Sequence, residues 1–299
     1  MKYPFYTCDV FTSDRFGGNP LAVITRAEGL TTVQMQNIAR EFNYSETSFV
    51  LPPEAGATRK VRIFTPSEEI PFAGHPNIGT AFVLATCGEL GPLHGDLKVV
   101  FEEQAGLVAI DVATTAGAVT ACELKAPQSL ALGPEVDLAR VADTLSLDPG
   151  DIETGTHVPR MASVGLEFLM VELKDRSCLA RARCNPNAIE ALEAEGIRAH
   201  LHLYTRDGDG FDIRARMFAP TTGVPEDPAT GSANCALAGL LAHYDQNSNA
   251  DAELRIAQGI EMGRPSLLVA RTEKRDGEVT GVWIAGGSVL VTEGTINLT

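Results

Sequence analysis

No stretch of this sequence approaches the roughly 20 apolar residues that a helix needs to span a bilayer. The first residues also lack the apolar core of a secretory signal peptide. Basic residues are few: 24 lysines and arginines stand against 39 acidic residues, for a formal net charge of -15 at pH 7. A nucleic-acid-binding surface needs a basic patch. We therefore expect a cytoplasmic protein without a nucleic-acid or membrane partner.

Paired cysteines and common cofactor motifs are missing as well. Six cysteines are scattered through the 299 residues, and no two have CxxC spacing. This pattern is typical of reduced, mostly buried thiols in the cytosol rather than of a disulfide framework. GxGxxG after the first strand, the P-loop, GxSxG and HExxH are all absent. The sequence thus gives no sign of a nucleotide cofactor or of a serine or zinc hydrolase.

What the sequence does contain is one segment that occurs twice, and each copy is predicted to be a turn that leads into a helix. At one fixed offset the first copy matches the second through Arg62 and Arg216, Phe64 and Phe218, Pro66 and Pro220, and Pro71 and Pro225. After an insertion of three residues, the matches are Gly74 with Gly231, His75 with Ser232, and Asn77 with Asn234. One unit used twice predicts two related lobes, whose helix N-termini face one cleft.

The hydrophobic pattern predicts the fold class. Helices are expected near residues 31–42, 76–86, 138–145, 186–195 and 231–244, between many short β-rich runs. Small and apolar residues nearly encircle the last of these helices, so it must be buried on all sides. We predict an α+β fold with two pseudo-symmetric lobes, each a mostly antiparallel β-sheet rolled around a central helix. The first lobe comprises residues 1–125 and about 285–299, and the second comprises 126–284.

Three local expectations accompany this prediction. Residues 127–135 are expected to form a crossover connection between the lobes. Strands at 253–258, 266–271 and 279–291 are expected to finish the chain. Gly74 is expected to take an unusual backbone angle before its helix, because glycine tolerates such angles.

The two predicted helix starts are candidate anion sites. Free backbone N–H groups at a helix start are a natural seat for a carboxylate. The first start carries the imidazole of His75, and the second adds hydroxyl donors beside Gly231. Ordinary helix starts have similar sequences, in which case Ser232 or Asn234 is simply a cap. Two copies in register favour a ligand site.

Other residues leave alternatives open. Asp227 is either an acid placed for the helix dipole or a partner for a substrate amine or hydroxyl. Arg62 and Arg216 precede the turns and have two possible roles. They bind anions or, since they are duplicated at strand positions, they brace the turns. His200 and His202 have the same-face spacing of two metal ligands on a strand, but no nearby cysteine or acid completes a site. We expect no metal.

At these residues the chain resembles the PhzF-like family of phenazine-biosynthesis isomerases, within the diaminopimelate-epimerase fold. The likeness covers nearly the whole length through several motifs in order: Asp9-Val-Phe-Thr, Gly18-Asn-Pro-Leu-Ala-Val23, Ser45-Glu-Thr47, Phe72-Ala-Gly-His-Pro76, Asp227-Pro-Ala-Thr-Gly-Ser232 and Gln258-Gly-Ile-Glu-Met-Gly-Arg264. The resemblance implies an active site between two lobes, a homodimer and no cofactor.

The resemblance also implies roles that spacing alone does not assign. By spacing, Glu46 is one acid among 39 acidic residues; the resemblance implies that it is the acid/base that shuttles a proton. The residues implied to line the site as catalytic or substrate-binding groups are Glu46, His75 and Asp227 together with Gly74, Asn77, Gly231 and Ser232. Related racemases carry a cysteine at each helix start, where this chain has Ala73 and Thr230. A two-thiol mechanism is therefore disfavoured.

The predicted function is a cofactor-independent isomerase that moves a proton within a small carboxylate-bearing metabolite. Two alternatives stay open: a racemase or epimerase of a small amino or hydroxy acid, and a non-catalytic small-acid-binding protein. The chain departs from the family's usual residues at Asn77, Val164 and Glu167, near the expected pocket rim. These departures leave room for a substrate other than the phenazine precursor.

Overall fold

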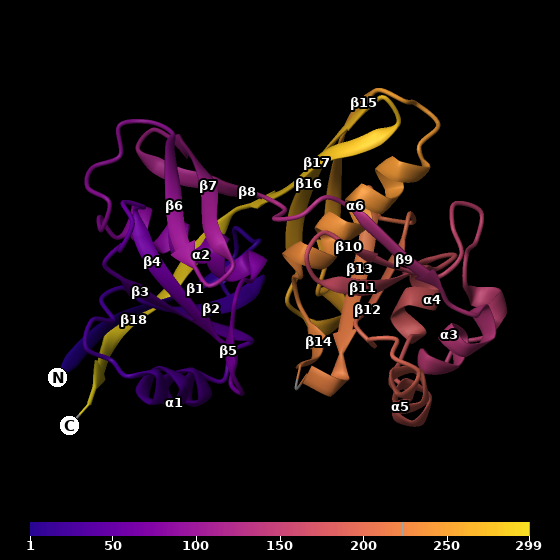
Figure 1. Cartoon of the computed structure of the whole chain (residues 1–299), viewed down its shortest axis with the longest axis horizontal. Helices are drawn as coiled ribbons and strands as arrows, with labels where there is room; N and C mark the ends of the chain where they lie inside the picture. The colour runs from indigo at the N-terminus through magenta and orange to yellow at the C-terminus, as the bar shows by residue number, and fades with distance from the viewer. Residues whose placement is uncertain (223, 299) are drawn as a thin grey trace. The chain divides into compact units, whose positions relative to one another are not determined.

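The computed structural model describes residues 1–222 and 224–298, and the chain divides into two compact units (Figure 1). Unit 1 comprises Met1–Lys125 with Ala285–Thr299, and unit 2 comprises Ala126–Ile284. Each unit has mostly antiparallel strands and one buried helix, so the predicted α+β class is confirmed. Within the described part of the chain, no helix is long and apolar enough to cross a membrane.

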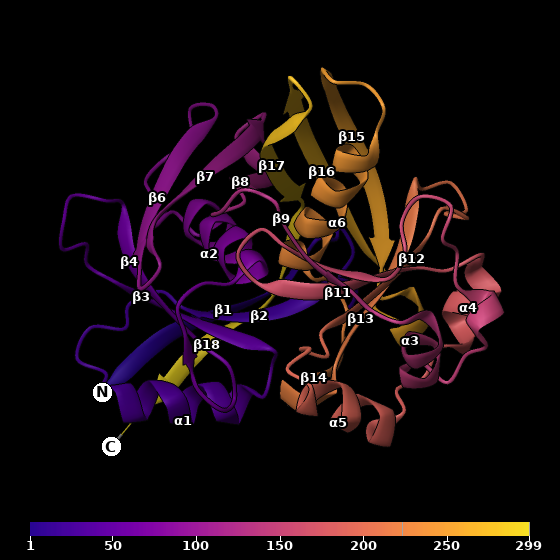
Figure 2. The ribbon, with the colours of Figure 1, turned by 45° about the vertical axis from the view of Figure 1, so that its right-hand side comes forward.

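Unit 1 is a curved sheet packed around helix α2. Its elements are β1 Lys2–Val10, β2 Asn19–Ile24, α1 Thr32–Phe42, β3 Glu46–Leu51, β4 Arg59–Phe64, β5 Glu69–Ile70, α2 Gly74–Thr86, β6 Leu97–Glu103, β7 Gly106–Thr115, β8 Ala118–Lys125 and β18 Ser288–Asn297. Neighbouring strands pair in the order β18, β1, β2, β3, β4, β6, β7 and β8, with only β2–β3 and β4–β6 parallel among these pairs. Figure 2 shows α2 between β1 and β2 on one side and β7 and β8 on the other. Every residue of α2 from Gly74 to Ala85 is buried, which explains its small and apolar composition.

Unit 2 repeats this plan around helix α6. Its elements are β9 Ala131–Glu135, α3 Leu138–Thr144, β10 Arg160–Ser163, β11 Glu167–Glu172, α4 Arg176–Arg181, α5 Pro186–Ala194, β12 Leu201–Thr205, β13 Ile213–Ala219, β14 Val224–Asp227, α6 Gly231–Tyr244, β15 Ala250–Gln258, β16 Ser266–Arg275 and β17 Glu278–Gly286, with short 3-10 turns at Pro149–Asp151, Pro220–Thr222 and Ile260–Met262. Here β11–β12 and β13–β15 are the parallel pairs, and α6 packs mainly on β16. The predicted helix at 231–244 is confirmed.

Helix α1 illustrates how local chemistry sets element boundaries. The Thr31 hydroxyl accepts from the Gln34 backbone N–H, and the Gln34 side chain accepts from the Thr31 N–H, which forms a capping box. Asn43 ends the helix in the left-handed conformation at φ 53°. The buried face of the helix carries Met35 and Ile38, which join the core beneath β3. Both ends of this helix were predicted from the sequence.

Of the three local expectations, the one for Gly74 is wrong and the other two are wrong in part, since the strands expected at 253–258 and 266–271 are confirmed as β15 and β16. Residues 131–135 form strand β9, which pairs with β10, inside the expected crossover; the proline in β9 suits an edge strand and masks the pattern. The expected last strand is two strands, β17 and β18, separated at Gly287, whose carbonyl accepts from the backbone N–H of Phe11. Gly74 and Gly231 are helical and are not among the described glycines with positive φ.

The duplication is confirmed in the strand registers, but one predicted match is wrong. Phe49 lies opposite Arg62 on β3–β4, as Leu203 lies opposite Arg216 on β12–β13. Ile70 lies opposite Ile63, and Asp227 lies opposite Met217. Ile63 and Met217 are equivalent, because each follows its arginine by one position. Their cross-strand partners, Ile70 and Asp227, are therefore equivalent as well. Pro71 therefore matches Pro228 rather than Pro225, and the insertion precedes β14.

Candidate functional site

An arginine braces the turn before each central helix. The Arg62 guanidinium donates two hydrogen bonds to Glu69, at 2.7 Å from Nε and 2.6 Å from Nη2. The Arg216 guanidinium donates to Glu226 in the same way, at 2.8 Å and 3.0 Å. Paired forks of this kind fix two chain segments against each other. The bracing role is thus confirmed for both arginines.

The start of α2 in unit 1 has no side-chain cap. Ala73 is the N-cap residue, and its methyl group cannot accept from the first helical N–H groups. The Asn77 amide is buried and donates to the Ala73 carbonyl at 3.0 Å, so Asn77 points back along the helix. Gly74 and His75 are the first two helical residues. This arrangement suits binding of an anion by backbone donors.

The start of α6 in unit 2 has the same geometry with more side-chain support. Asn234 donates to the Thr230 carbonyl at 3.0 Å, as Asn77 does to Ala73. Gln258 accepts from the Asn234 amide at 2.8 Å and from the Thr230 N–H at 3.1 Å. The Thr230 hydroxyl donates to Asp227 at 2.5 Å instead of capping the helix. Ser232 is partly buried in the first turn.

Glu46 and His75 lie together in unit 1. Glu46 is the first residue of β3, and its Oε2 is 3.4 Å from His75 Nε2. That distance is longer than a well-formed hydrogen bond. The His75 side chain is 6% exposed and the Glu46 side chain 17%. Burial lowers the pKa of His75 to about 3, because a charged imidazolium is poorly solvated there. The pair is therefore a carboxyl group beside a neutral imidazole.

Asn19 selects the tautomer of this imidazole. Its amide Nδ2 lies 3.3 Å from His75 Nδ1, and both groups are buried. An amide N–H donates, so Nδ1 accepts and carries no proton. The single proton of neutral His75 is then on Nε2, the nitrogen that faces Glu46. His75 is arranged to donate towards the Glu46 carboxylate and to orient it, without adding a positive charge.

We expect His75 to stay neutral, with its proton on Nε2, between about pH 5 and about pH 8. Nitrogen-15 shifts of labelled protein measure this, and the spectrum of His75→Gln assigns the signal. In denatured protein the same histidine should titrate near its ordinary pKa of about 6.5. An imidazolium signal in the native protein near about pH 6, or a proton on Nδ1, would contradict the assignment.

The remaining histidine pair does not form a metal site in this structure. His202 Nε2 lies 3.2 Å from the Asn234 carbonyl oxygen, which adds His202 to the network under α6. His200 packs its ring against Phe168. Across residues 1–222 and 224–298, no group of three or more histidine, cysteine or acidic side chains is placed to hold a metal ion.

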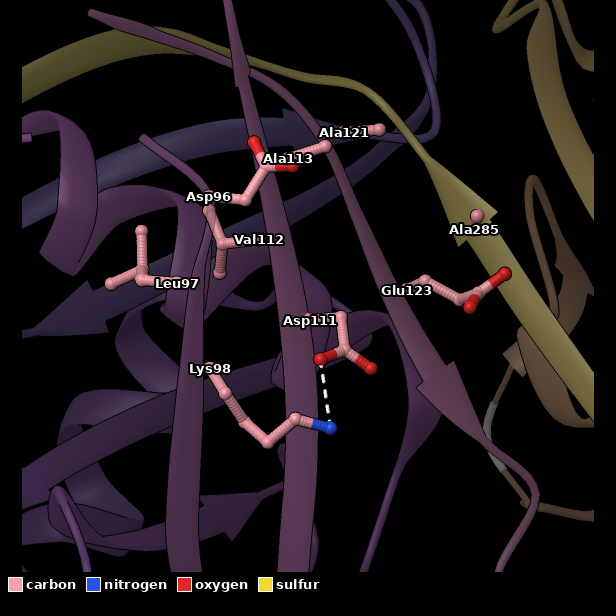
Figure 3. A pocket seen from close by; sticks show the side chains of 9 residues that line it. All are labelled: Asp96, Leu97, Lys98, Asp111, Val112, Ala113, Ala121, Glu123 and Ala285. Atoms are coloured by element: carbon pink, nitrogen blue, oxygen red, sulfur yellow. Dashed lines mark ion pairs between the residues drawn. The ribbon is translucent and has the colours of Figure 1, made fainter. Parts of the chain in front are cut away.

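A hollow on the surface of unit 1 contains none of the predicted site residues (Figure 3). It lies over β6, β7 and β8, and its lining includes Lys98, Asp111 and Glu123. Lys98 is paired with Asp111 at 2.8 Å. The hollow is shallow and its only cationic lining residue is already neutralised, so it is a poor seat for a carboxylate.

The structure therefore brings the predicted residues together in two groups. Glu46, Gly74, His75 and Asn77 meet at the start of α2 in unit 1. Gly231, Ser232 and Asp227 meet at the start of α6 in unit 2. Sequence reasoning missed two supporting residues, Asn19 and Gln258. Both stand inside motifs that carried the family resemblance, and their place in those motifs was the available signal.

A sheet closed around a buried helix, built twice, defines the diaminopimelate-epimerase-like class of fold. A phenazine-biosynthesis PhzF-family protein of Bacillus anthracis has this fold, with TM-score 0.89, 24% identity and all of both chains covered. A hydroxyproline epimerase of Agrobacterium vitis shares the fold more distantly, with TM-score 0.66 and 15% identity over 99% of this chain and 92% of that one.

The family model described as phenazine biosynthesis-like protein matches residues 8–294. An uncharacterised isomerase of Mesorhizobium japonicum is 38% identical over 96% of both chains. The trans-2,3-dihydro-3-hydroxyanthranilate isomerase of Pseudomonas chlororaphis is 37% identical over 97% of this chain and 98% of its own length. The chain belongs to the phenazine biosynthesis-like (PhzF) family and is an enzyme of the isomerase class.

Proposed function

We propose that this isomerase moves a proton between two carbons of a small carboxylate-bearing metabolite, with Glu46 as the proton shuttle. The observation that carries the proposal is the Glu46 carboxyl group beside a neutral His75 at a helix start that has no side-chain cap. A neutral donor orients the carboxylate without neutralising it. One carboxylate can then accept a proton from one carbon and return it to another.

Substrate binding is assigned to the two helix starts. Backbone N–H groups at Gly74 and His75 are suited to the substrate carboxylate. Gly231, Ser232 and Asp227 are proposed to contact the same substrate, which the repeated architecture and the family resemblance support. Asn77 contributes by holding the first turn of α2 through the Ala73 carbonyl.

The substrate class follows from the named relatives. Because one relative acts on trans-2,3-dihydro-3-hydroxyanthranilate, we propose a cyclic carboxylate with amino or hydroxy substituents. Racemisation by two thiols lacks its acid/base pair here, since Ala73 and Thr230 are the N-cap residues of α2 and α6. A cytoplasmic homodimer that works without a cofactor stays a prediction from the resemblance.

Turnover in heavy water tests the proposal. The protein is incubated with trans-2,3-dihydro-3-hydroxyanthranilate and with a panel of related cyclic amino and hydroxy acids. We expect at least one compound to be isomerised, with part of the migrating hydrogen retained, because one base carries it within the site. Racemisation with complete deuterium uptake would support the epimerase alternative. Tight binding without hydrogen exchange into any compound would support the non-catalytic alternative.

A further inference from the structure

Glu103 occupies in unit 1 the strand register position that Gln258 has in unit 2. On the parallel pair β4–β6, Lys60 lies opposite Glu102, and on β13–β15, Ala215 lies opposite Gln258. Val61, the residue after Lys60, is the equivalent of Ala215. It precedes Arg62 on β4 by one position, as Ala215 precedes Arg216 on β13. Glu103, which follows Glu102, is therefore the equivalent of Gln258.

A second contact supports this equivalence independently. Just beyond Glu103, the Ala105 N–H donates to the Pro71 carbonyl at 3.2 Å. On β16, Ser266 lies opposite Gln258, and its hydroxyl donates to the Pro228 carbonyl at 3.1 Å. Pro71 and Pro228 are the matched prolines before the two central helices. In both units the beginning of the following strand is thus tied to the segment that enters the helix.

The Gln258 amide uses both of its ends to hold the start of α6. Its carbonyl oxygen accepts from Asn234 and from the Thr230 N–H, and its NH₂ group donates to the Asp227 carbonyl at 2.8 Å. A neutral group with one acceptor and one donor end is what this position requires. A carboxylate offers only acceptors, whereas a protonated carboxyl group has both.

Glu103 is buried where ionisation is unfavourable. Both of its carboxyl oxygens are buried, and within residues 1–222 and 224–298 neither reaches a hydrogen-bond partner. Burial raises the pKa of Glu103 to about 8, and the nearby Asn77 amide acts in the opposite direction. At neutral pH the carboxyl group is mostly protonated.

We propose that Glu103 is a positioning residue: as a neutral carboxylic acid beside Asn77 it supports the start of α2 from the register position that Gln258 has under α6, and loss of its proton weakens binding of an anion at that helix start. This inference rests on the proposed role of α2 in binding the substrate carboxylate. An ionised Glu103 places a second negative charge beside the bound anion and competes for the same backbone donors.

The charged groups on neighbouring elements do not offset that charge. Lys60 on β4 is paired with Glu54 at 2.6 Å, and Arg62 is paired with Glu69 on β5 at 2.6 Å. His75 on α2 is neutral. On β7 the residue opposite Glu103 is Gly106. The negative charge of an ionised Glu103 would therefore act mainly on the start of α2 and on an anion bound there.

The test measures binding of anthranilate, a small cyclic amino carboxylate, by calorimetry from about pH 6 to about pH 9.5, across the alkaline limb expected for a group that titrates near pH 8. For the unchanged protein we expect Kd to rise about tenfold or more across the alkaline half of this range. In Glu103→Gln the rise should be lost, because an amide does not ionise. In Glu103→Ala we expect weak binding at every pH. Glu102→Gln, on the adjacent residue, should keep the alkaline rise.

Infrared spectroscopy gives a second readout that does not depend on turnover or on ligand. The band of a protonated carboxyl group should be present at about pH 7 and missing in Glu103→Gln. An alkaline rise in Kd that persists in Glu103→Gln, or absence of that band from the unchanged protein, would overturn the proposal. A protein that passes both tests but isomerises nothing would contradict only the proposed function.

Discussion

Glu46→Gln is expected to lower kcat by about 10² to 10⁴-fold, the usual range for loss of a general acid/base. Glutamine keeps the shape of the side chain and an oxygen that can face His75 Nε2, but it cannot take up a proton. Binding should survive, because the helix-start donors are untouched. The measurements are kcat on the isomerised compound and calorimetric Kd for the same compound.

Two further variants make this result interpretable. Glu41→Gln changes an exposed acid on α1, five positions away, and should behave as the unchanged protein. Glu46→Asp keeps the acid but withdraws it from His75 by one methylene, so its activity should lie between those of the other two variants. If Glu46→Gln turned over within about threefold of the unchanged protein, the shuttle assignment would be wrong.

Arg216→Ala is expected to lower the free energy of unfolding by about 3 to 5 kcal/mol, the cost of leaving a buried charge without its partner. Arg216 is 5% exposed, and besides Glu226 it donates to the carbonyls of Leu179 and Ala182. These two carbonyls stand at the end of α4, where helices leave acceptors unsatisfied. Removal of the guanidinium leaves Glu226 and the Leu179 carbonyl without this donor, whereas the Ala182 carbonyl still accepts from Arg183 at 2.7 Å. Urea denaturation measures the loss.

The duplication supplies a matched control for this prediction. Arg62 makes the equivalent pair with Glu69, but 21% of its side chain is exposed. Its remaining side-chain bond is to the exposed Thr32 hydroxyl. The carboxylates left behind are similarly exposed, Glu69 at 16% and Glu226 at 19%, but Arg216→Ala also leaves the Leu179 carbonyl without its donor. The loss in Arg62→Ala is therefore expected to be smaller by about 1 to 3 kcal/mol. Equal losses in the two variants would show that the bonds from Arg216 to backbone carbonyls do not add to the cost.

The neutral state of His75 has a consequence for the chemistry. An imidazolium beside Glu46 would stabilise the carboxylate and weaken it as a base. A neutral Nε2–H donor orients the carboxylate at a smaller cost in basicity. Asn19 and the burial of the ring together produce this state, and neither acts directly on the substrate in the proposed mechanism.

Much of the architecture was readable in local patterns. Thr31 and Asn43 mark the ends of α1 through capping chemistry that involves only neighbouring residues. The ring of small apolar residues from Gly231 onward predicted a buried helix, because such a surface is stable only when covered on all sides. The repeated arginine predicted two related turns, and the ordered motifs predicted the family.

Other features depend on which residues meet across strands, and these were decided by the tertiary structure. The match of Pro71 with Pro228 follows from strand register. Counting residues along the chain had matched Pro71 with Pro225 instead. The neutral His75 and the protonated Glu103 follow from burial, because only the packed protein removes water from those side chains. Capping and periodicity act over a few residues and can be read from the chain. Desolvation and cross-strand pairing join distant residues, so they exist only once the chain has folded.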